Sequence, residues 1–393
     1  MPALKTPPAS AKPSGLGTIG AIIGGVASVL FILWLLRGDN SFLTYLLDVD
    51  VYRLGAKEFL GGGNLYDQSF HTRLIDLPFT YPPFGALFFA PLALLPQTAV
   101  QVIIIALSAL CLWASVAAVL SHYGQARPWV EALWVVPFAL VSEPVRATFE
   151  FGQINLVLMA LVIADVTGVF RRLPRGVLVG IAAAIKLTPA YYGLYYLARR
   201  DWKGVAGVIG GFLGATFLAF LIHPHTTIQY FTAVLFDNGR IGNLEYAMNV
   251  SLSGLNARIS ADSRLIWLVA TVIVTVLVYF SARSAHKAGQ DFLAFIVVAL
   301  GCLCVSPVSW SHHWVWLVPA AIALYFTRHY VLAAWAILMT YFLDFHALLP
   351  RDHQVEMSWN WFEQLLGLHY VLYALVVIVV VMVRPVGAGR RRR

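Results

Sequence analysis

Residues 97–120 read QTAVQVIIIALSALCLWASVAAVL and contain no charged side chain. A helix needs roughly 20 apolar residues to cross the hydrocarbon core of a bilayer, so this stretch predicts a transmembrane helix. Ten similar apolar segments lie at about residues 16–36, 129–144, 154–170, 176–198, 204–222, 265–282, 291–308, 314–326, 331–344 and 366–383. In lipid, each run must form all its backbone hydrogen bonds internally, which favours helices. The runs therefore predict an all-α polytopic membrane protein with about 11–12 transmembrane helices.

The composition indicates a membrane protein rather than a nucleic-acid-binding protein. Of the 393 residues, 60% are hydrophobic, which exceeds what one soluble core can bury. The net charge is +8, but most Lys and Arg lie in short loops between apolar segments, where they set topology and face anionic lipid. We therefore expect membrane lipids as partners and no nucleic acid. Three cysteines lie within apolar runs and support no disulfide framework: Cys111, Cys302 and Cys304.

The charged residues of the loops predict how the chain is oriented. With a cytoplasmic N-terminus, the basic loops fall inside, and they hold Arg127, Arg171, Arg172, Arg175, Arg199, Arg200, Lys203, Arg283, Lys287 and Arg328. Most acidic residues then fall outside, in larger loops at about 37–83, 223–263 and 345–365. We expect a multi-pass protein of the plasma membrane whose larger polar loops lie on the outer side.

The same pattern predicts one domain. A Pro- and Ala-rich N-terminus, residues 1–15, is expected to be disordered in the cytoplasm. Residues 16–383 form the integral-membrane domain, and residues 384–393 form a basic cytoplasmic tail. No internal repeat and no appended soluble domain is visible in the sequence.

Segment 176–198 has a basic loop at each end, yet it is long enough for only one crossing. A break at Lys186-Leu187-Thr188-Pro189 resolves the conflict. Either two half-helices enter and leave on the cytoplasmic side, or two steep spans meet near Lys186. A charge inside an apolar run is costly, so Lys186 is a candidate phosphate ligand. The alternative is that its side chain snorkels toward an interface.

The first outer loop holds two candidate catalytic carboxylates, Asp48 and Asp50. We expect a juxtamembrane helix over Leu46–Leu60, a stop at Gly61-Gly62-Gly63-Asn64, and a second interfacial helix over Phe84–Leu95. A carboxylate there can act as general base on the hydroxyl of a lipid-anchored sugar. Two residues are about 200° apart around a helix, so only one of the pair can face a given site. Alternatively, both are solvated loop acids.

Other polar clusters lie near the ends of apolar segments. His312 and His313 follow Trp310 and could donate hydrogen bonds to a phosphate, or belong to an interfacial aromatic belt. Gln153 and Asn155 could hold sugar hydroxyls, or cap a helix and bond between helices. Four outer arginines could neutralise a leaving phosphate or pair with outer acids: Arg146, Arg240, Arg258 and Arg264.

Seven short motifs follow one another along the chain between about residues 48 and 320. They are Asp48-x-x-Val51-Tyr52, Gly63-Asn64-Leu65-Tyr66-Asp67, Phe79-Thr80-Tyr81-Pro82-Pro83-Phe84, Gly152-Gln153-x-Asn155, Ala184-Ile185-Lys186-Leu187-Thr188-Pro189, Asn249-x-Ser251-x-x-Gly254 and Ser306-Pro307-x-Ser309-Trp310-Ser311-His312-His313. The ordered set resembles glycosyltransferase family 87, whose members are integral-membrane enzymes with the GT-C fold. Within that family it most resembles the actinobacterial α-1,2-mannosyltransferases of phosphatidylinositol mannosides.

The resemblance implies inverting transfer of mannose from polyprenyl-phosphate-mannose to a mannosylated phosphatidylinositol lipid on the extracytoplasmic face. The catalytic base would be the Asp three residues before Val-Tyr, which is Asp48, with Asp50 as second choice. His312 would be the catalytic histidine that faces the donor phosphate or the acceptor sugar. The substrate-binding residues would be Asp50, Tyr52, Tyr81, Gln153, Asn155, Lys186, Asn249, Arg258, Trp310 and His313. No cofactor and no metal is expected, because a lipid monophosphate leaving group carries less charge than a nucleoside diphosphate.

Two alternatives stay open at this point. The donor could be another polyprenyl phosphosugar, such as an arabinofuranosyl donor, because motifs for the lipid phosphate do not recognise the sugar. A glycolipid transporter or flippase would also fit the broken helices and the lysine within the membrane. Transporters usually show two corresponding halves, and the two halves of this sequence do not correspond.

Overall fold

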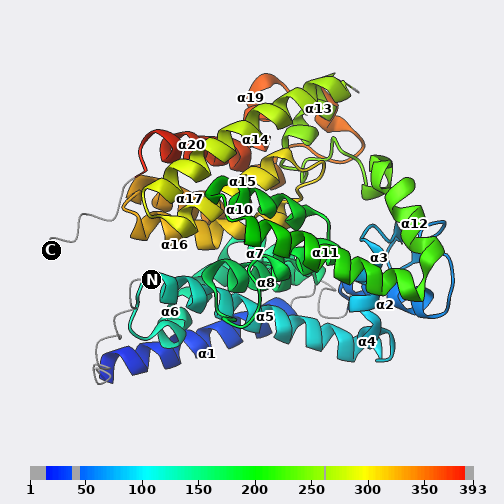
Figure 1. The fold of residues 1–393 in the computed structure, drawn as a ribbon, viewed down its shortest axis with the longest axis horizontal. Helices are drawn as coiled ribbons and strands as arrows, with labels where there is room; N and C mark the ends of the chain where they lie inside the picture. The colour runs from blue at the N-terminus through cyan, green and yellow to red at the C-terminus, as the bar shows by residue number, and fades with distance from the viewer. Residues whose placement is uncertain (1–14, 38–44, 261–262, 386–393) are drawn as a thin grey trace.

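The computed structural model describes residues 15–37, 45–260 and 263–385. Within these ranges the regular structure is helical, apart from one antiparallel hairpin of β1 (Ser69–His71) and β2 (Asp76–Pro78). The predicted all-α class is therefore confirmed (Figure 1). The expectations for the N-terminal segment and the basic tail fall almost entirely on residues 1–14 and 386–393, outside the described residues.

Several helices have the length and apolar character to cross a membrane. Four do so alone in the described ranges: α5 (Gln97–His122), α11 (Trp202–Ile222), α14 (Arg264–Lys287), and α17 (Tyr330–Phe342) continued by α18 (Phe345–Leu348). Two bent pairs raise the number to six: α6 (Pro128–Val141) with α7 (Glu143–Phe151) at 78°, and α19 (Trp361–Gly367) with α20 (His369–Val383) at 68°. Shorter apolar helices occur within α1 (Gly15–Arg37) and as α8 (Asn155–Thr167) and α15 (Asp291–Val305). The chain is thus polytopic, and counting the bent pairs and these three shorter helices gives nine candidate spans in the described residues, against the 11–12 that we expected.

The remaining helices are short. They are α2 (Leu47–Leu60), α3 (Pro83–Phe88), α4 (Ala90–Ala93), α9 (Val177–Ile185), α10 (Gly193–Arg199), α12 (Pro224–Thr232), α13 (Leu252–Ser260) and α16 (Leu317–Phe326), with 3₁₀ turns η1 (Thr188–Tyr192), η2 (Val234–Phe236), η3 (Asn238–Ile241), η4 (Ser311–Trp316) and η5 (Val355–Ser358). Helix α2 matches the predicted juxtamembrane helix. The second predicted interfacial helix is divided at Phe89 into α3 and α4.

Helix α15 lies at the centre of the bundle, packed against α14, α16 and α20. Every residue from Phe292 to Val305 is buried. A helix that is apolar on all sides is stable only where protein surrounds it, and this one has no polar face to offer an interface. The core therefore forms around α15, and the N-terminal helices α2 and α3 lie toward one end of the bundle, beside α12 (Figure 1).

The segment with the predicted break is a re-entrant hairpin. Helix α9 ends at Lys186, whose backbone is extended, and the chain returns through η1 and α10. Its two ends meet, since Arg175 Nη1 lies 2.8 Å from Asp201 Oδ2. The buried carboxylate of Asp165 accepts hydrogen bonds from Gly176 N at one end and from the Tyr196 hydroxyl at the other. The structure thus agrees with the prediction of two half-helices that enter and leave on the same side. Lys186 lies at the tip of this hairpin.

Close packing of α9 on α11 holds this hairpin, and it depends on glycine. A Cβ atom at Gly211 would lie 2.3 Å from the carbonyl oxygen of Val177. Gly210, the preceding residue, has no atom within 4 Å of such a position. The backbones of the two helices therefore touch along the Gly211 face, as small residues permit in membrane helices.

We expect Gly211→Leu to lower the thermal unfolding midpoint of the detergent-solubilised protein, because leucine would force α9 and α11 apart at an overpacking cost of about 1–3 kcal/mol or more. The matched control is Gly210→Leu on the same helix, which should leave the midpoint nearly unchanged. Equal midpoints for the two variants would contradict this packing.

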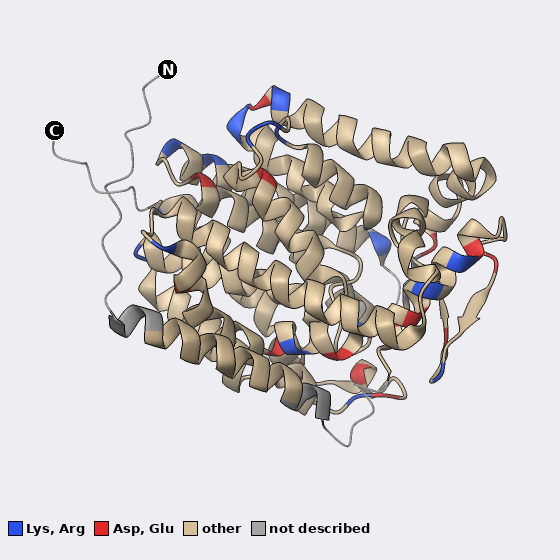
Figure 2. Cartoon of the chain, turned by 90° about the horizontal axis from the view of Figure 1, so that it is seen from below, with Lys and Arg blue, Asp and Glu red and all other residues tan. Residues whose placement is uncertain are grey.

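The basic loops gather at one end of the bundle. Arg199 pairs with Asp291 at 3.3 Å, and Arg283 Nη1 donates to the carbonyl of Ala198 at 2.9 Å, so loops from distant parts of the sequence meet there. Figure 2 shows Lys and Arg on the loops at the left of the bundle, whereas α2 and the β-hairpin lie at the opposite end. This grouping agrees with the loop assignment made from the sequence.

Candidate active site

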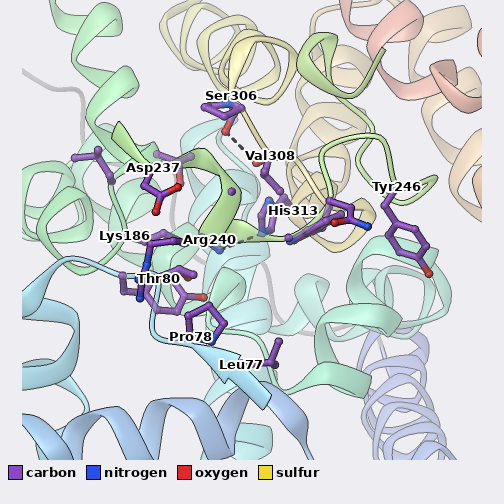
Figure 3. Close-up of a pocket in the computed structure, with 18 of the residues that line it drawn as sticks. Leu77, Pro78, Thr80, Lys186, Asp237, Arg240, Tyr246, Ser306, Val308 and His313 are labelled. Atoms are coloured by element: carbon purple, nitrogen blue, oxygen red, sulfur yellow. Dashed lines mark hydrogen bonds between the residues drawn. The ribbon is translucent and has the colours of Figure 1, made fainter. Parts of the chain in front are cut away.

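A cavity of about 1250 Å³ lies at the end of the bundle that holds α2 and the tip of the re-entrant hairpin. Seven of the residues chosen from the sequence line it: Asp48, Tyr52, Tyr81, Gln153, Lys186, Trp310 and His313. Figure 3 shows Lys186 and His313 in this wall, with Arg240 beside them and Thr80 on the side of the first outer loop. Segments that are far apart in the sequence therefore converge on one space.

Asp48 lies in the first turn of α2, with its half-buried side chain in the cavity wall. Burial raises the pKa of its carboxyl to about 6, although a hydrogen bond with Gln153 and the charge of Lys186 act in the opposite direction. A carboxylate with this pKa is ionised at neutral pH and is a stronger base than an ordinary aspartate. Asp48 thus has the properties of a general base.

Gln153 connects Asp48 to two tyrosines. Its Oε1 accepts hydrogen bonds from the hydroxyls of Tyr52 at 3.1 Å and Tyr81 at 3.3 Å, and these hydroxyls lie 3.0 Å apart. With its oxygen occupied, the amide nitrogen is the group that can donate to Asp48. The ring of Tyr52 also stacks on Phe89 with centroids 4.3 Å apart. This hydrogen-bond network of Gln153 and the two tyrosines fixes the orientation of the Asp48 carboxylate.

Gly152 allows Gln153 to lie close to the first turn of α2. It ends α7 with φ at +70°, a conformation that side chains other than glycine rarely adopt. A Cβ there would lie 2.5 Å from Val49 Cγ2 and 2.9 Å from Leu46 Cβ, so α2 packs directly on the turn. The glycine of the Gly152-Gln153-x-Asn155 motif therefore brings Gln153 next to the first turn of α2.

Lys186 supplies positive charge opposite this network. Its Nζ lies 3.1 Å from His313 Nε2, 3.4 Å from Asn155 Oδ1 and 5.3 Å from the centroid of the Tyr81 ring. The His313 ring also bonds to the carbonyl of Val308, so its Nε2 accepts from the ammonium group. None of these three partners carries a negative charge, and the Asp48 carboxylate interacts with the ammonium group only through its charge. The lysine therefore keeps the capacity to bind an anion.

Arg240 is a second cation in the cavity wall. Its Nε and Nη2 atoms are buried, and neither has a hydrogen-bond partner among the residues that the structure describes. An unpaired buried guanidinium is costly, so this one suits an anionic ligand. From the sequence it was only one of four outer arginines, and we expected Arg258 rather than Arg240 to bind substrate.

The part of the cavity formed by residues 243–246 and 352–356 has a different chemistry. It carries carboxylates, an amide and aromatic rings: Glu245, Tyr246, Trp310, Asp352, Gln354 and Glu356. The ring of Tyr246 packs edge-on against Trp310, with centroids 6.1 Å apart. Carboxylates and amides suit hydroxyl groups, and aromatic faces suit the apolar side of a sugar. Apart from Trp310, sequence reasoning missed these residues, because they belong to no recognised motif.

The third outer loop contributes strained backbone to this region. Asp352, His353 and Gln354 all have positive φ, at 75°, 53° and 63°. Such conformations cost about 1 kcal/mol or more each for residues other than glycine, and they cluster at binding sites. The buried carboxylate of Glu356 holds the loop by accepting from the backbone of Asp352 at 3.3 Å and of Ala247 at 3.2 Å. The backbone of the second outer loop at Ala247 therefore helps to hold the third outer loop in its strained conformation.

Five residues chosen from the sequence are not among those lining the cavity: Asp50, Asn155, Asn249, Arg258 and His312. Asp50 is buried and accepts from the hydroxyl of Tyr45 at 2.9 Å and from Arg53 at 3.3 Å. Arg258 is hydrogen-bonded within the protein, because its Nε donates to Gln364 Oε1 at 2.9 Å. Of Asp48 and Asp50, therefore, only Asp48 lines the cavity.

His313, not His312, is in the cavity wall, which reverses our order of preference for these histidines. The carbonyl of His312 accepts a hydrogen bond from Asn155 Nδ2 at 2.9 Å, so Asn155 joins this turn to Lys186. Asn249 is a second support, because its Oδ1 accepts from the backbone of Ser309 at 3.0 Å. Both asparagines position the residues that line the cavity.

The sequence is similar to known membrane glycosyltransferases. The model of glycosyltransferase family 87 matches residues 79–307, more than half of the chain. A polyprenol-phosphate-mannose-dependent alpha-(1-2)-phosphatidylinositol mannoside mannosyltransferase of Mycobacterium tuberculosis is 37% identical over 91% of this chain and 88% of its own length. The corresponding Mycolicibacterium smegmatis protein is 36% identical over 91% and 87%. A Mycolicibacterium smegmatis phosphatidylinositol pentamannoside mannosyltransferase is 34% identical over 79% and 76%.

Proposed function

This chain belongs to glycosyltransferase family 87, a family of GT-C membrane glycosyltransferases, and from that premise we propose that it is an inverting α-1,2-mannosyltransferase. The donor is polyprenyl-phosphate-mannose, and the acceptor is a hydroxyl group of a mannosylated phosphatidylinositol lipid. The names of the relatives support both substrates. The observation that carries the proposal is that Asp48 and Lys186 face the same cavity.

The proposed reaction uses one carboxylate and two cations of the cavity wall. Asp48 removes the proton from the acceptor hydroxyl while the oxygen attacks the anomeric carbon of mannose. The bond from that carbon to the phosphate oxygen breaks on the opposite face, which inverts the configuration. Lys186 and Arg240 hold the departing polyprenyl phosphate and stabilise its growing charge. The proton stays on Asp48 until the product leaves.

The charges also assign the two substrates to different parts of the cavity. The donor phosphate binds on the side of Lys186 and Arg240, the two cations of the cavity wall, near which Asp237 also lies (Figure 3). The acceptor sugars bind on the side of Glu245 and Asp352, where carboxylates would repel a phosphate and suit hydroxyl groups. Tyr246 and Trp310 provide rings against which a sugar can pack.

The direct test uses the purified protein with synthetic donors and a dimannosylated phosphatidylinositol acceptor. Mass spectrometry should detect an acceptor that has gained one hexose with polyprenyl-phosphate-mannose. Gain of a pentose from decaprenyl-phosphate-arabinose, with no gain of hexose, would identify the alternative donor. Movement of glycolipid between leaflets without any covalent product would identify a transporter and contradict the proposal.

We also propose that the cavity opens on the extracytoplasmic face. It lies at the end opposite the basic loops, which the positive-inside rule assigns to the cytoplasm. In intact cells, a membrane-impermeant maleimide should label Arg73→Cys, on an exposed turn beside the cavity, and should not label Arg172→Cys. The reverse pattern would place the cavity in the cytoplasm.

The activity should depend on pH through Asp48. Because this residue acts only as the carboxylate, we expect kcat/KM to rise with pH through about 6 and to level off above it. Lys186→Met removes a charge that lowers the pKa of Asp48, so the inflection of that variant should move to higher pH. The measurement is a pH profile of the purified enzyme. A flat profile across this range would contradict the assignment of the base.

A further inference from the structure

A second cluster of polar side chains lies outside the cavity. It joins Glu143, at the start of α7, to Asp344 and His346, at the turn from α17 into α18. One potential ligand atom from each of the three lies within 4.8 Å of the others. His346 Nε2 is 3.0 Å from Asp344 Oδ1 and 3.5 Å from Glu143 Oε1. None of the three residues lines the cavity.

The cluster places two carboxylates around one imidazole, both at ion-pair distance from its Nε2. The His346 side chain is fully buried, at 0% exposure, and neither ring nitrogen has a hydrogen-bond partner among the described residues. A ring N–H that donated to a carboxylate would point at its oxygen. Glu143 Oε1 and Asp344 Oδ1 lie near Nε2 but outside hydrogen-bond geometry. Asp344 Oδ1, the oxygen nearest to the ring, also has no hydrogen-bond partner. The ring nitrogen and one oxygen of each carboxylate therefore lie in one compact cluster.

The distances suit a metal ion. With metal–ligand bonds of about 2.0–2.2 Å, neighbouring ligand atoms lie about 3.0–3.5 Å apart, and the two distances from His346 Nε2 fall in that range. One imidazole nitrogen and two carboxylate oxygens form a ligand set that zinc or manganese accepts. A divalent cation would also neutralise the buried carboxylate of Glu143 and the half-buried carboxylate of Asp344.

The surroundings orient these ligands. The Tyr370 hydroxyl donates to Glu143 Oε2 at 3.1 Å, which leaves Oε1 directed at His346. Arg146 Nη2 lies 3.8 Å from Asp344 Oδ2, on the oxygen that does not face the ring. Supporting contacts of this kind, made to the far oxygen of each carboxylate, are typical of metal sites.

We propose that Glu143, Asp344 and His346 bind one divalent cation of the zinc or manganese class, which fixes the start of α7 to the turn between α17 and α18. Helix α7 leads into Gly152 and Gln153, so the ion would anchor the wall that orients Asp48 without touching substrate. The Thr148 hydroxyl of α7 also donates to the carbonyl of His312 at 3.1 Å, which links the same helix to the histidine turn.

The test is the metal content of the full-length protein, purified in detergent without chelator or affinity metal. Plasma mass spectrometry should find about one zinc or manganese ion per chain in the wild type. His346→Gln should lose it at least tenfold, and His225→Gln, which changes an exposed histidine, should keep it. After treatment with EDTA, adding zinc or manganese chloride to the wild type should raise its thermal midpoint by several degrees.

The second measurement keeps the test decisive if His346→Gln fails to fold, because it needs only the wild type. Less than a tenth of an equivalent of metal in the wild type, together with no thermal shift on adding either ion, would overturn the proposal. The cluster would then be an ordinary buried ion pair. Neither result depends on mannosyltransferase activity, so failure of this proposal and failure of the proposed function are distinguishable.

Discussion

Asp48→Asn is expected to lower the single-turnover rate of mannose transfer by about 100-fold to 10,000-fold, the contribution typical of a general base. Asparagine keeps the size of the side chain and its hydrogen bond with Gln153, but it cannot accept the hydroxyl proton. Binding of the lipid donor should change little, because Lys186 and Arg240 remain. The loss should therefore appear in kcat rather than in KM.

The matched control is Asp50→Asn on the same helix. Its carboxylate is buried with Tyr45 and Arg53, away from the cavity, so this variant is expected to keep most of the chemical rate and to lose stability instead. If Asp50→Asn abolished transfer while Asp48→Asn retained it, the two acids would have to exchange roles. Thermal unfolding of both variants separates a chemical effect from misfolding.

Lys186→Met is expected to reduce kcat/KM by about 100-fold to 1,000-fold, the cost typical of losing one group that stabilises transition-state charge. The methionine side chain approximates the stem of the lysine without its charge, so the tip of the re-entrant hairpin should still fold. The loss should be largest with the polyprenyl-phosphate donor, because the removed charge faces the phosphate. Initial rates at varied donor and acceptor concentrations measure it.

The control for this prediction is Lys57→Met. Lys57 is exposed on α2 and is not a cavity residue, so it shares the membrane-surface environment without the proposed role. If both lysine variants lost activity equally, the effect would come from general attraction to anionic lipid. If Lys186→Met kept full activity, the lysine would have no part in holding the phosphate.

Local features of the sequence predicted much of the fold. The uncharged run at 97–120 required a transmembrane helix, and it is part of α5. Basic loops at both ends of segment 176–198 required a break in the segment, either a re-entrant path or two steep spans, and Lys186-Leu187-Thr188-Pro189 indicated where the break lies. Helical spacing allowed only one of Asp48 and Asp50 to face a given site, and the resemblance of Asp48-x-x-Val51-Tyr52 to glycosyltransferase family 87 favoured Asp48. Each of these inferences needed information from only one stretch of chain.

Other parts of the site depend on contacts that no single stretch contains. His312 and His313 are adjacent, and only the path of η4 decides that His313 meets Lys186. Arg240 was one of several outer arginines, and its role follows from its place in the cavity wall and from its two unpaired buried nitrogens. Two members of the proposed metal site, Glu143 and His346, are about 200 residues apart and form no recognisable spacing. Long-range packing creates these sites.

The central claim is that Asp48 activates an acceptor hydroxyl for attack on a polyprenyl phosphosugar. It is tested most directly by NMR of the product that the purified protein forms from donor carrying ¹³C at the anomeric carbon. We predict a new α-1,2-mannoside signal with the wild type and, over the same time, none with Asp48→Asn. No glycoside from the wild type, or an equal signal from Asp48→Asn, would contradict the account.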